Sequence, residues 1–160
     1  MYTSKNDLSE RTRRQIVELC NARLADAIDL QTQTKQAHWN VKGPHFIALH
    51  ELFDKVNQDV EEYVDLIAER GVQLGGIVDG TARSVAKRST LPEYPVEGGD
   101  GRQHVDALSS ALAAFGKLAR SAIEESARLG DQGTNDIFIE ISRGIDKWLW
   151  MVESHLRNEG

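Results

Sequence analysis

The stretch "QAHWNVKGPHFIALHELFD", residues 36–54, decides the fold because it places a break between two helical patterns. Gly43-Pro44 lies in its middle, and a proline inside a helix removes a hydrogen bond and clashes with the preceding turn. The same stretch contains three histidines and ends with His50 and Asp54, four positions apart. It therefore predicts a corner between two helices and raises the question of a metal site there.

Helical periodicity extends from this corner in both directions. The chain from Leu8 to about Asn40 contains no glycine or proline and predicts one long helix. A second long helix is predicted from about Pro44, which suits a first helical turn, to Arg70. Its apolar positions recur at spacings of three and four residues: Leu49, Phe53, Val56, Val60, Val64 and Ile67.

The second half of the chain repeats this pattern after a long interruption. Glycines and prolines in residues 71–100 predict one long connection, with a short helix near 81–87. A third helix is predicted over about 103–129, and a short turn separates it from a fourth, with Thr134 as N-cap and Arg157 near the end. Two short turns and one long crossover predict an all-α fold, the ferritin-like four-helix bundle with a short helix in the crossover.

Composition narrows the class of protein. At 160 residues the chain fits one domain, predicted to span 1–160. The net charge of -6 argues against a generally nucleic-acid-binding surface and suits a protein that handles cations. The single cysteine, Cys20, cannot form an internal disulfide, so we expect a reducing compartment and a buried thiol. No apolar signal-peptide core or membrane-spanning run occurs, which predicts a cytoplasmic protein with no membrane partner.

A polar strip runs along the predicted second helix beside its apolar strip. With His50 at zero and about 100° per residue, Asp54 falls at about 40°, Asp65 at about 60° and Glu69 at about 100°. The apolar side chains cluster at roughly 240° to 320°. Imidazoles and carboxylates without a thiolate suit Fe(II), Mn or Zn.

The length of this strip excludes a metal site made by one copy of the helix. His50 and Glu69 are roughly 28 Å apart along the axis, and Asp54 and Asp65 about 16 Å, whereas ligand bonds are only about 2 to 2.3 Å long. Two antiparallel copies around a two-fold axis would bring the first end of one helix, with His50 and Asp54, to the second end of the other, with Asp65 and Glu69. His38, just before the corner, can reach the first end from the first helix. A metal site here therefore predicts an intersubunit site in an oligomer.

The residues alone fit a solvated surface strip without a metal as well as they fit a metal site. The helix is acidic elsewhere, at Asp59, Glu61 and Glu62. "HELFD" resembles the zinc-protease pattern H-E-x-x-H, but Asp54 replaces the second histidine, which argues against a peptidase. No Glu-x-x-His pair occurs, which argues against the usual di-iron site within one subunit. Three histidines outside the strip are expected at the surface: His45, His104 and His155.

Three segments resemble signature segments of the Dps family, the small ferritin-like proteins of bacteria. They are "TKQAHWNVKGPHFIALHELFD" (34–54), "DLIAERGVQLGG" (65–76) and "SRGIDKWLWMVES" (142–154). The resemblance covers nearly the whole chain, with its loosest fit at 93–130. It implies a shell of twelve subunits that oxidises Fe(II), usually with hydrogen peroxide, stores the ferric mineral and protects DNA from oxidative damage. The implied cofactor is non-haem iron, in a site shared between two-fold-related subunits.

The resemblance also assigns roles to particular residues. His38, His50 and Asp54 match the ferroxidase ligands that one subunit gives. Asp65 and Glu69 match those from its two-fold partner, the arrangement that the length of the strip requires. Four further residues match family features: Trp39 and Trp150 as aromatic residues near the iron, which intercept radicals or simply pack, and Asp136 and Asp146 as acids of the three-fold iron-entry pores.

DNA is the open question among the partners. Some family members bind DNA through a lysine-rich N-terminal arm, whereas the first fourteen residues here carry a balance of only +2 and the end, "LRNEG", is not basic. DNA binding is therefore expected to be weak and strongly salt-dependent. Two alternatives to a ferroxidase stay open: a nucleoid-associated DNA-binding protein whose shell is mainly a scaffold, and a zinc- or manganese-binding shell with little oxidase activity.

Overall fold

Two antiparallel helix pairs form the bundle. The structure is a computed structural model and describes residues 1–95, 97 and 99–157; no strand occurs among them. Its elements are α1 (Glu10–Asn40), α2 (Phe46–Gln73), α3 (Ala82–Arg88), α4 (Gly101–Arg128), α5 (Gln132–Glu153) and the short 3-10 helix η1 (Ser154–Leu156).

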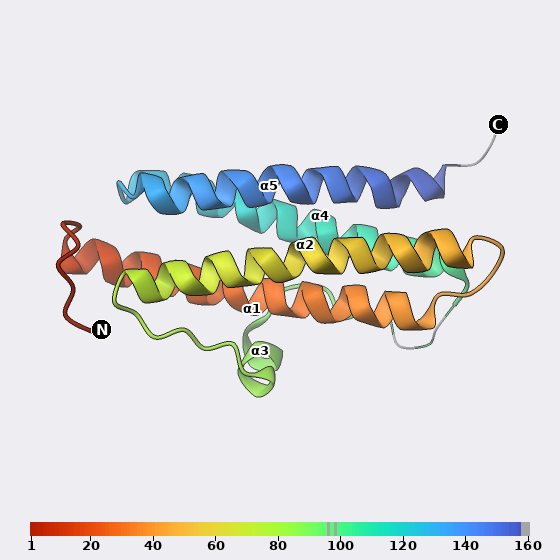
Figure 1. Ribbon diagram of the computed structural model, residues 1–160, viewed down its shortest axis with the longest axis horizontal. Helices are drawn as coiled ribbons and strands as arrows, with labels where there is room; N and C mark the ends of the chain where they lie inside the picture. Colours follow the sequence, from red (N-terminus) through yellow and green to blue (C-terminus); the bar gives the residue numbers. More distant parts are fainter. Residues whose placement is uncertain (96, 98, 158–160) are drawn as a thin grey trace.

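The order of the four long helices is that of a ferritin-like bundle. α1 packs against α2 and α4 against α5, and contacts of α1 with α4 and of α2 with α5 join the pairs. α2 and α4 run in the same direction, because the connection that carries α3 returns along the length of the bundle (Figure 1). The predicted fold class, all-α with a short helix in the crossover, is confirmed.

The apolar strip of α2 forms part of the core, as its periodicity predicts. Phe53, Val56, Val60 and Ile67 are fully buried, and Val64 packs partly buried against the same cluster. Because this strip faces inward, the neighbouring polar strip lies at the edge of the bundle. The largest buried side chains that surround it come from the other three long helices: Ile16, Leu24, Leu30, Leu108, Leu112, Phe115, Phe138, Ile141 and Ile145.

The corner between α1 and α2 is a tight turn. α1 ends at Asn40 as predicted, and Gly43 adopts a φ of +107°, a conformation that favours glycine. The N–H of Phe46 donates to the carbonyl of Gly43, and α2 begins there, two residues after the predicted start at Pro44. The proline lies in the turn rather than in the first helical turn.

The other helix boundaries differ slightly from those predicted. α2 continues to Gln73, beyond Arg70, because Gly71 is accommodated in the helix and the chain turns only at Gly75, whose φ is +83°. α1 begins after Ser9, whose hydroxyl accepts the N–H of Thr12.

The N-cap of α5 is Asp131, and the prediction of Thr134 is wrong. The Asp131 carboxylate accepts both the N–H of Thr134, at 3.1 Å, and its hydroxyl, at 2.6 Å. Asp131 therefore caps the helix three residues earlier, with Gly133 inside the first turn. At its other end α5 stops at Glu153 and continues as η1 to Leu156, short of the predicted Arg157.

Polar contacts hold the long connection against α1. The buried carboxylate of Asp26 accepts the N–H of Thr90 at 2.7 Å and its hydroxyl at 2.9 Å. Gln33 donates to the carbonyl of Pro92 at 3.0 Å. The connection therefore stays on the α1 side of the bundle (Figure 1). Within the described residues, none of the helices combines the length and apolar character needed to cross a bilayer.

Candidate metal centre

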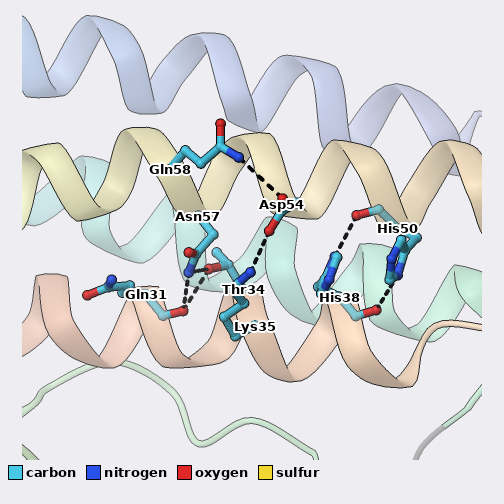
Figure 2. A network of polar contacts seen from close by, with 8 residues as sticks. All are labelled: Gln31, Thr34, Lys35, His38, His50, Asp54, Asn57 and Gln58. Atoms are coloured by element: carbon cyan, nitrogen blue, oxygen red, sulfur yellow. Dashed lines mark hydrogen bonds and ion pairs between the residues drawn. The ribbon is translucent and has the colours of Figure 1, made fainter.

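His38 of α1 and His50 of α2 are bound to each other's backbone. The Nδ1 of His38 lies 2.8 Å from the carbonyl oxygen of His50, and the Nδ1 of His50 lies 2.8 Å from the carbonyl oxygen of His38. The rings stack with centroids 3.7 Å apart and planes inclined by 22°. Figure 2 shows this reciprocal pair between the two helices. Both residues are half-buried.

These bonds determine which nitrogen of each ring is left for a metal. A carbonyl oxygen only accepts hydrogen bonds, so each Nδ1 carries the hydrogen. In a neutral imidazole the other nitrogen, Nε2, then has a free lone pair. A second ring nitrogen bonded to a carbonyl is the usual way in which proteins orient metal-binding histidines. His38 and His50 are therefore oriented as ligands by their own backbone.

Asp54 lies one turn after His50 and carries the negative charge of this end. Lys35 of α1 donates to its Oδ1 at 2.5 Å, and Gln58 donates to its Oδ2 at 3.2 Å (Figure 2). The hydrogen bond from Lys35, with the positive charge nearby, holds the pKa of Asp54 below its usual range. The carboxylate is therefore ionised at neutral pH. It is paired with the Lys35 ammonium, which a metal would have to displace.

Two residues of this end were not predicted from the sequence. Lys35 is three residues before His38 and so shares its helix face, a spacing that could have identified it. Asn57 is buried, and its amide donates to the carbonyl of Gln31 at 2.9 Å and to the hydroxyl of Thr34 at 2.7 Å. This amide ties α2 to α1 one turn beyond Asp54 (Figure 2) and fixes the spacing of the two helices.

Asp65 and Glu69 lie farther along α2, and both are exposed. Within the described residues, neither carboxylate has a hydrogen bond or an ion pair, and no group of three or more His, Cys, Asp or Glu side chains is placed to hold a metal ion. In one chain His38, His50 and Asp54 therefore lie at one end of the strip without forming a three-ligand metal group, and Asp65 and Glu69 lie at the other end. The intersubunit site stays a prediction.

The helix beneath these two acids is anchored by the next residue. Arg70 donates to the Asp131 carboxylate at 2.8 Å and to the Thr134 hydroxyl at 2.9 Å, at the start of α5. Burial alone would raise the pKa of Asp131, but the Thr134 hydroxyl and N–H, together with the Arg70 guanidinium, hold it below the usual range.

The remaining predicted site residues are all exposed. Trp39 and Trp150 are 68% and 59% exposed, so neither packs in the core of its own chain. Asp136 and Asp146 lie on α5, and the Asp146 carboxylate accepts from Arg120 at 3.0 Å. These positions are open to a neighbouring subunit, and their roles stay predictions.

Of the three histidines expected at the surface, His104 is buried, so that expectation is wrong for it. It is 3% exposed because the long connection covers it, and its Nδ1 lies 2.6 Å from the Tyr94 hydroxyl. Burial lowers the pKa of His104. His45 and His155 are exposed, as expected. Cys20 is fully buried, and burial raises the pKa of its thiol to about 12, so a thiolate does not form at neutral pH.

The bundle order and the oriented imidazoles define a ferritin-like protein, and comparison with known proteins agrees. The family model described as the ferritin-like domain matches residues 17–159. A relative from Agrobacterium fabrum, named DNA protection during starvation protein, is 40% identical over 158 residues, which are 99% of this chain and 98% of that protein. The chain belongs to the Dps family.

Solved structures support the same assignment. Mycobacterium smegmatis Dps, in its tetragonal form, superposes with a TM-score of 0.93 and 31% identity, covering 99% of this chain and 96% of that one. DpsC from Streptomyces coelicolor also gives 0.93, with 29% identity, covering 100% of this chain and 92% of that one.

Proposed function

We propose that this chain assembles into a twelve-subunit cytoplasmic shell that oxidises Fe(II), preferably with hydrogen peroxide, and stores the ferric product. The observation that carries this proposal is the reciprocal bonding of His38 and His50, which leaves two oriented Nε2 lone pairs beside an ionised Asp54. Asp65 and Glu69 of the partner subunit complete the set across a two-fold axis.

The donor set fits iron as a substrate. Two imidazoles and three carboxylates, without a thiolate, suit a metal that cycles between Fe(II) and Fe(III) better than a closed zinc site, which is usually tetrahedral. Carboxylates stabilise Fe(III) more than Fe(II), which favours oxidation. Cys20 is too deeply buried to alter this set.

The chain's own residues position the substrate and adjust its charge. His38 and His50 bind Fe(II) only while neutral, so acid displaces the metal. Lys35 leaves Asp54 as Fe(II) binds, and its ammonium then neutralises negative charge at the edge of the site. Hydrogen peroxide accepts one electron from each of two Fe(II) ions, giving two Fe(III) and two hydroxide ions. No hydroxyl radical forms in this step.

DNA binding is the weaker alternative. Among the four cations of the first fourteen residues, Arg13 is buried and donates to the carbonyls of Leu8 and Leu74, and Arg14 pairs with Glu10. Few cations are left for phosphates, so a gel shift at low salt should disappear at moderate salt. Tight binding that survives moderate salt would favour the nucleoid-associated scaffold instead.

Mixing two inactive variants tests the shared site. His50→Ala/Asp54→Ala removes the first end of the strip, and Asp65→Ala/Glu69→Ala removes the second. Each homogeneous shell should oxidise Fe(II) no faster than free solution. In a coexpressed mixture, half of the two-fold pairs contain one chain of each kind, and each such pair has one complete site of two.

The mixed shells should therefore recover about a quarter of the wild-type rate. Ferric absorbance after anaerobic loading and peroxide addition measures the rate, and native mass spectrometry verifies the mixing. No recovery in verified mixed shells would contradict an intersubunit site. A wild-type rate in either homogeneous variant would contradict the ligand assignment.

A further inference from the structure

A pocket lies at the end of the bundle where α2 and α4 begin. Its volume is about 710 Å³, and it is lined by three separate segments: the corner between α1 and α2, the start of α4, and the chain after α5. These segments meet at one end of the bundle (Figure 1). The buried side chains of Leu49 and Val105 form part of its lining. None of the described lining residues is a predicted metal ligand, so the pocket is separate from the proposed iron site.

The pocket is positively charged, in contrast to the chain as a whole. Three cationic side chains line it: Lys42, Arg102 and Arg157. Asp100 is the one carboxylate among the described lining residues, so with its histidines neutral the pocket carries a net charge of +2, three cations against one acid. The whole chain carries -6. A general need for solubility therefore does not explain why these cations gather here.

Two of these cations are not neutralised by the protein itself. No ion pair within the described residues involves Lys42 or Arg157. The Asp100 carboxylate is engaged elsewhere, because it accepts the N–H of Gln103 at 3.2 Å and caps α4. The positive charge of Lys42 and Arg157 is therefore available to a ligand.

Two helix N-termini add to the positive field of the side chains. α2 and α4 run in the same direction, so both begin at this end of the bundle (Figure 1). α2 starts after His45 without a side-chain cap, and neither helix has an acidic residue in its first turn. The first turn of a helix carries partial positive charge on its unpaired N–H groups, which favours a bound anion.

We propose that this pocket binds a compact oxyanion with two or more negative charges, such as pyrophosphate or citrate. Guanidinium and ammonium groups form their strongest hydrogen bonds with phosphate and carboxylate oxygens. The volume falls within the range of small-molecule sites, roughly 300 to 1,000 Å³, and exceeds the space that a single phosphate fills. The cations line a concave wall, whereas a DNA duplex presents its phosphates on a convex surface, so a small anion fits better.

Isothermal titration calorimetry on the assembled, metal-free protein tests the proposal. We expect saturable binding of pyrophosphate at low ionic strength, weakened about tenfold or more in Lys42→Gln/Arg157→Gln. Lys117→Gln/Arg143→Gln makes the same charge change at exposed positions outside the pocket and should bind as the wild type does. Because Lys42 and Arg157 are also exposed, thermal denaturation should show that both double variants stay folded.

A parallel titration with citrate distinguishes the two sources of this chemistry. Tighter binding of pyrophosphate assigns the pocket to phosphates, and tighter binding of citrate assigns it to carboxylates; in either case Lys42→Gln/Arg157→Gln should weaken it.

Three results would overturn the proposal: no saturable binding of either anion by the wild type, equal weakening in the two double variants, or loss of a DNA gel shift in Lys42→Gln/Arg157→Gln with anion binding unchanged. The rate of Fe(II) oxidation should be the same in this variant and the wild type. The anion site and the proposed ferroxidase therefore stand or fall separately.

Discussion

The two ends of α2 carry the same kinds of side chain but are built differently. At the first end, His50 and Asp54 are held by contacts with α1, through the carbonyl of His38 and the ammonium of Lys35. At the second end, Asp65 and Glu69 are exposed, and only the helix beneath them is anchored, through Arg70. One chain thus holds His50 and Asp54 through contacts with α1, without forming a three-ligand metal group in the described residues, and presents Asp65 and Glu69 on an anchored helix.

The largest expected effect comes from removing one ligand at each end. His50→Ala and Asp65→Ala should each slow peroxide-driven Fe(II) oxidation by on the order of 100-fold, because each removes a ligand from the same shared site. Only His50→Ala should also destabilise the protein, by about 1 kcal/mol, since the His38 carbonyl loses its donor. Ferric absorbance and thermal denaturation measure the two effects, with exposed His45→Ala as control. A drop in stability for Asp65→Ala would contradict the contrast between the ends.

The anchor of the second end should matter for stability rather than for metal binding. Asp131→Asn breaks a buried ion pair with Arg70 and should cost about 3 kcal/mol, lowering the melting temperature by roughly 6 to 12 °C. Asp136→Asn, at an exposed position of α5, should leave the melting temperature nearly unchanged.

The same substitution has a predicted pH dependence. The pKa of Asp131 is lowered in the folded protein, so its contribution is complete above the pKa of the unfolded chain and is lost as the pH falls through the folded value. The stability difference between wild type and Asp131→Asn should therefore shrink in acid. A constant difference down to the lowest pH would contradict the assigned pair.

A smaller effect is expected from the cation at the first end. Lys35→Met frees the Asp54 carboxylate, and because exposed ion pairs contribute up to about 1 kcal/mol, Fe(II) affinity should rise about two- to fivefold. Anaerobic isothermal titration calorimetry measures the Fe(II) affinity. Lys55→Met removes an exposed cation next to Asp54 in sequence and should have less effect. An equal gain in both variants would indicate general electrostatics rather than direct competition.

The smallest expected effect concerns the proposed pore acids on α5. Asp146 is already paired with Arg120, whereas Asp136 has no such partner in the described residues. Asp136→Asn should therefore slow iron uptake into the shell by about twofold, and Asp146→Asn by less. Stopped-flow measurement of the rate of iron uptake at low ionic strength compares the two variants. The reverse order would show that the Arg120 pair opens in the assembled pore.

The sequence predicted the features that follow from local rules. The break at Gly43-Pro44 and the periodic strip of Phe53 to Ile67 needed only the geometry of one helix. The contacts that complete the first end depend on how α1 and α2 lie together, so the exchange of bonds between His38 and His50 could not be read from spacing.

The incorrect expectations have a related cause. His104 lies on α4, and the apolar pattern of that helix does not predict that the long connection covers it. Tyr94, which contacts His104, belongs to that connection. Thr134 is a good N-cap by type, but Asp131, three residues earlier, binds both its N–H and its hydroxyl. Side-chain partners brought together by the fold decided both cases.

The reciprocal bonds of His38 and His50 also bear on how this chain tolerates mutation. Their acceptors are carbonyl oxygens, which every amino acid supplies, proline included. No substitution of a neighbouring side chain deletes the groups that orient the rings, provided that the spacing of the two helices is kept. The geometry of the ligands is thus robust to sequence drift around them, and the residues beside the histidines are free to diverge under other pressures.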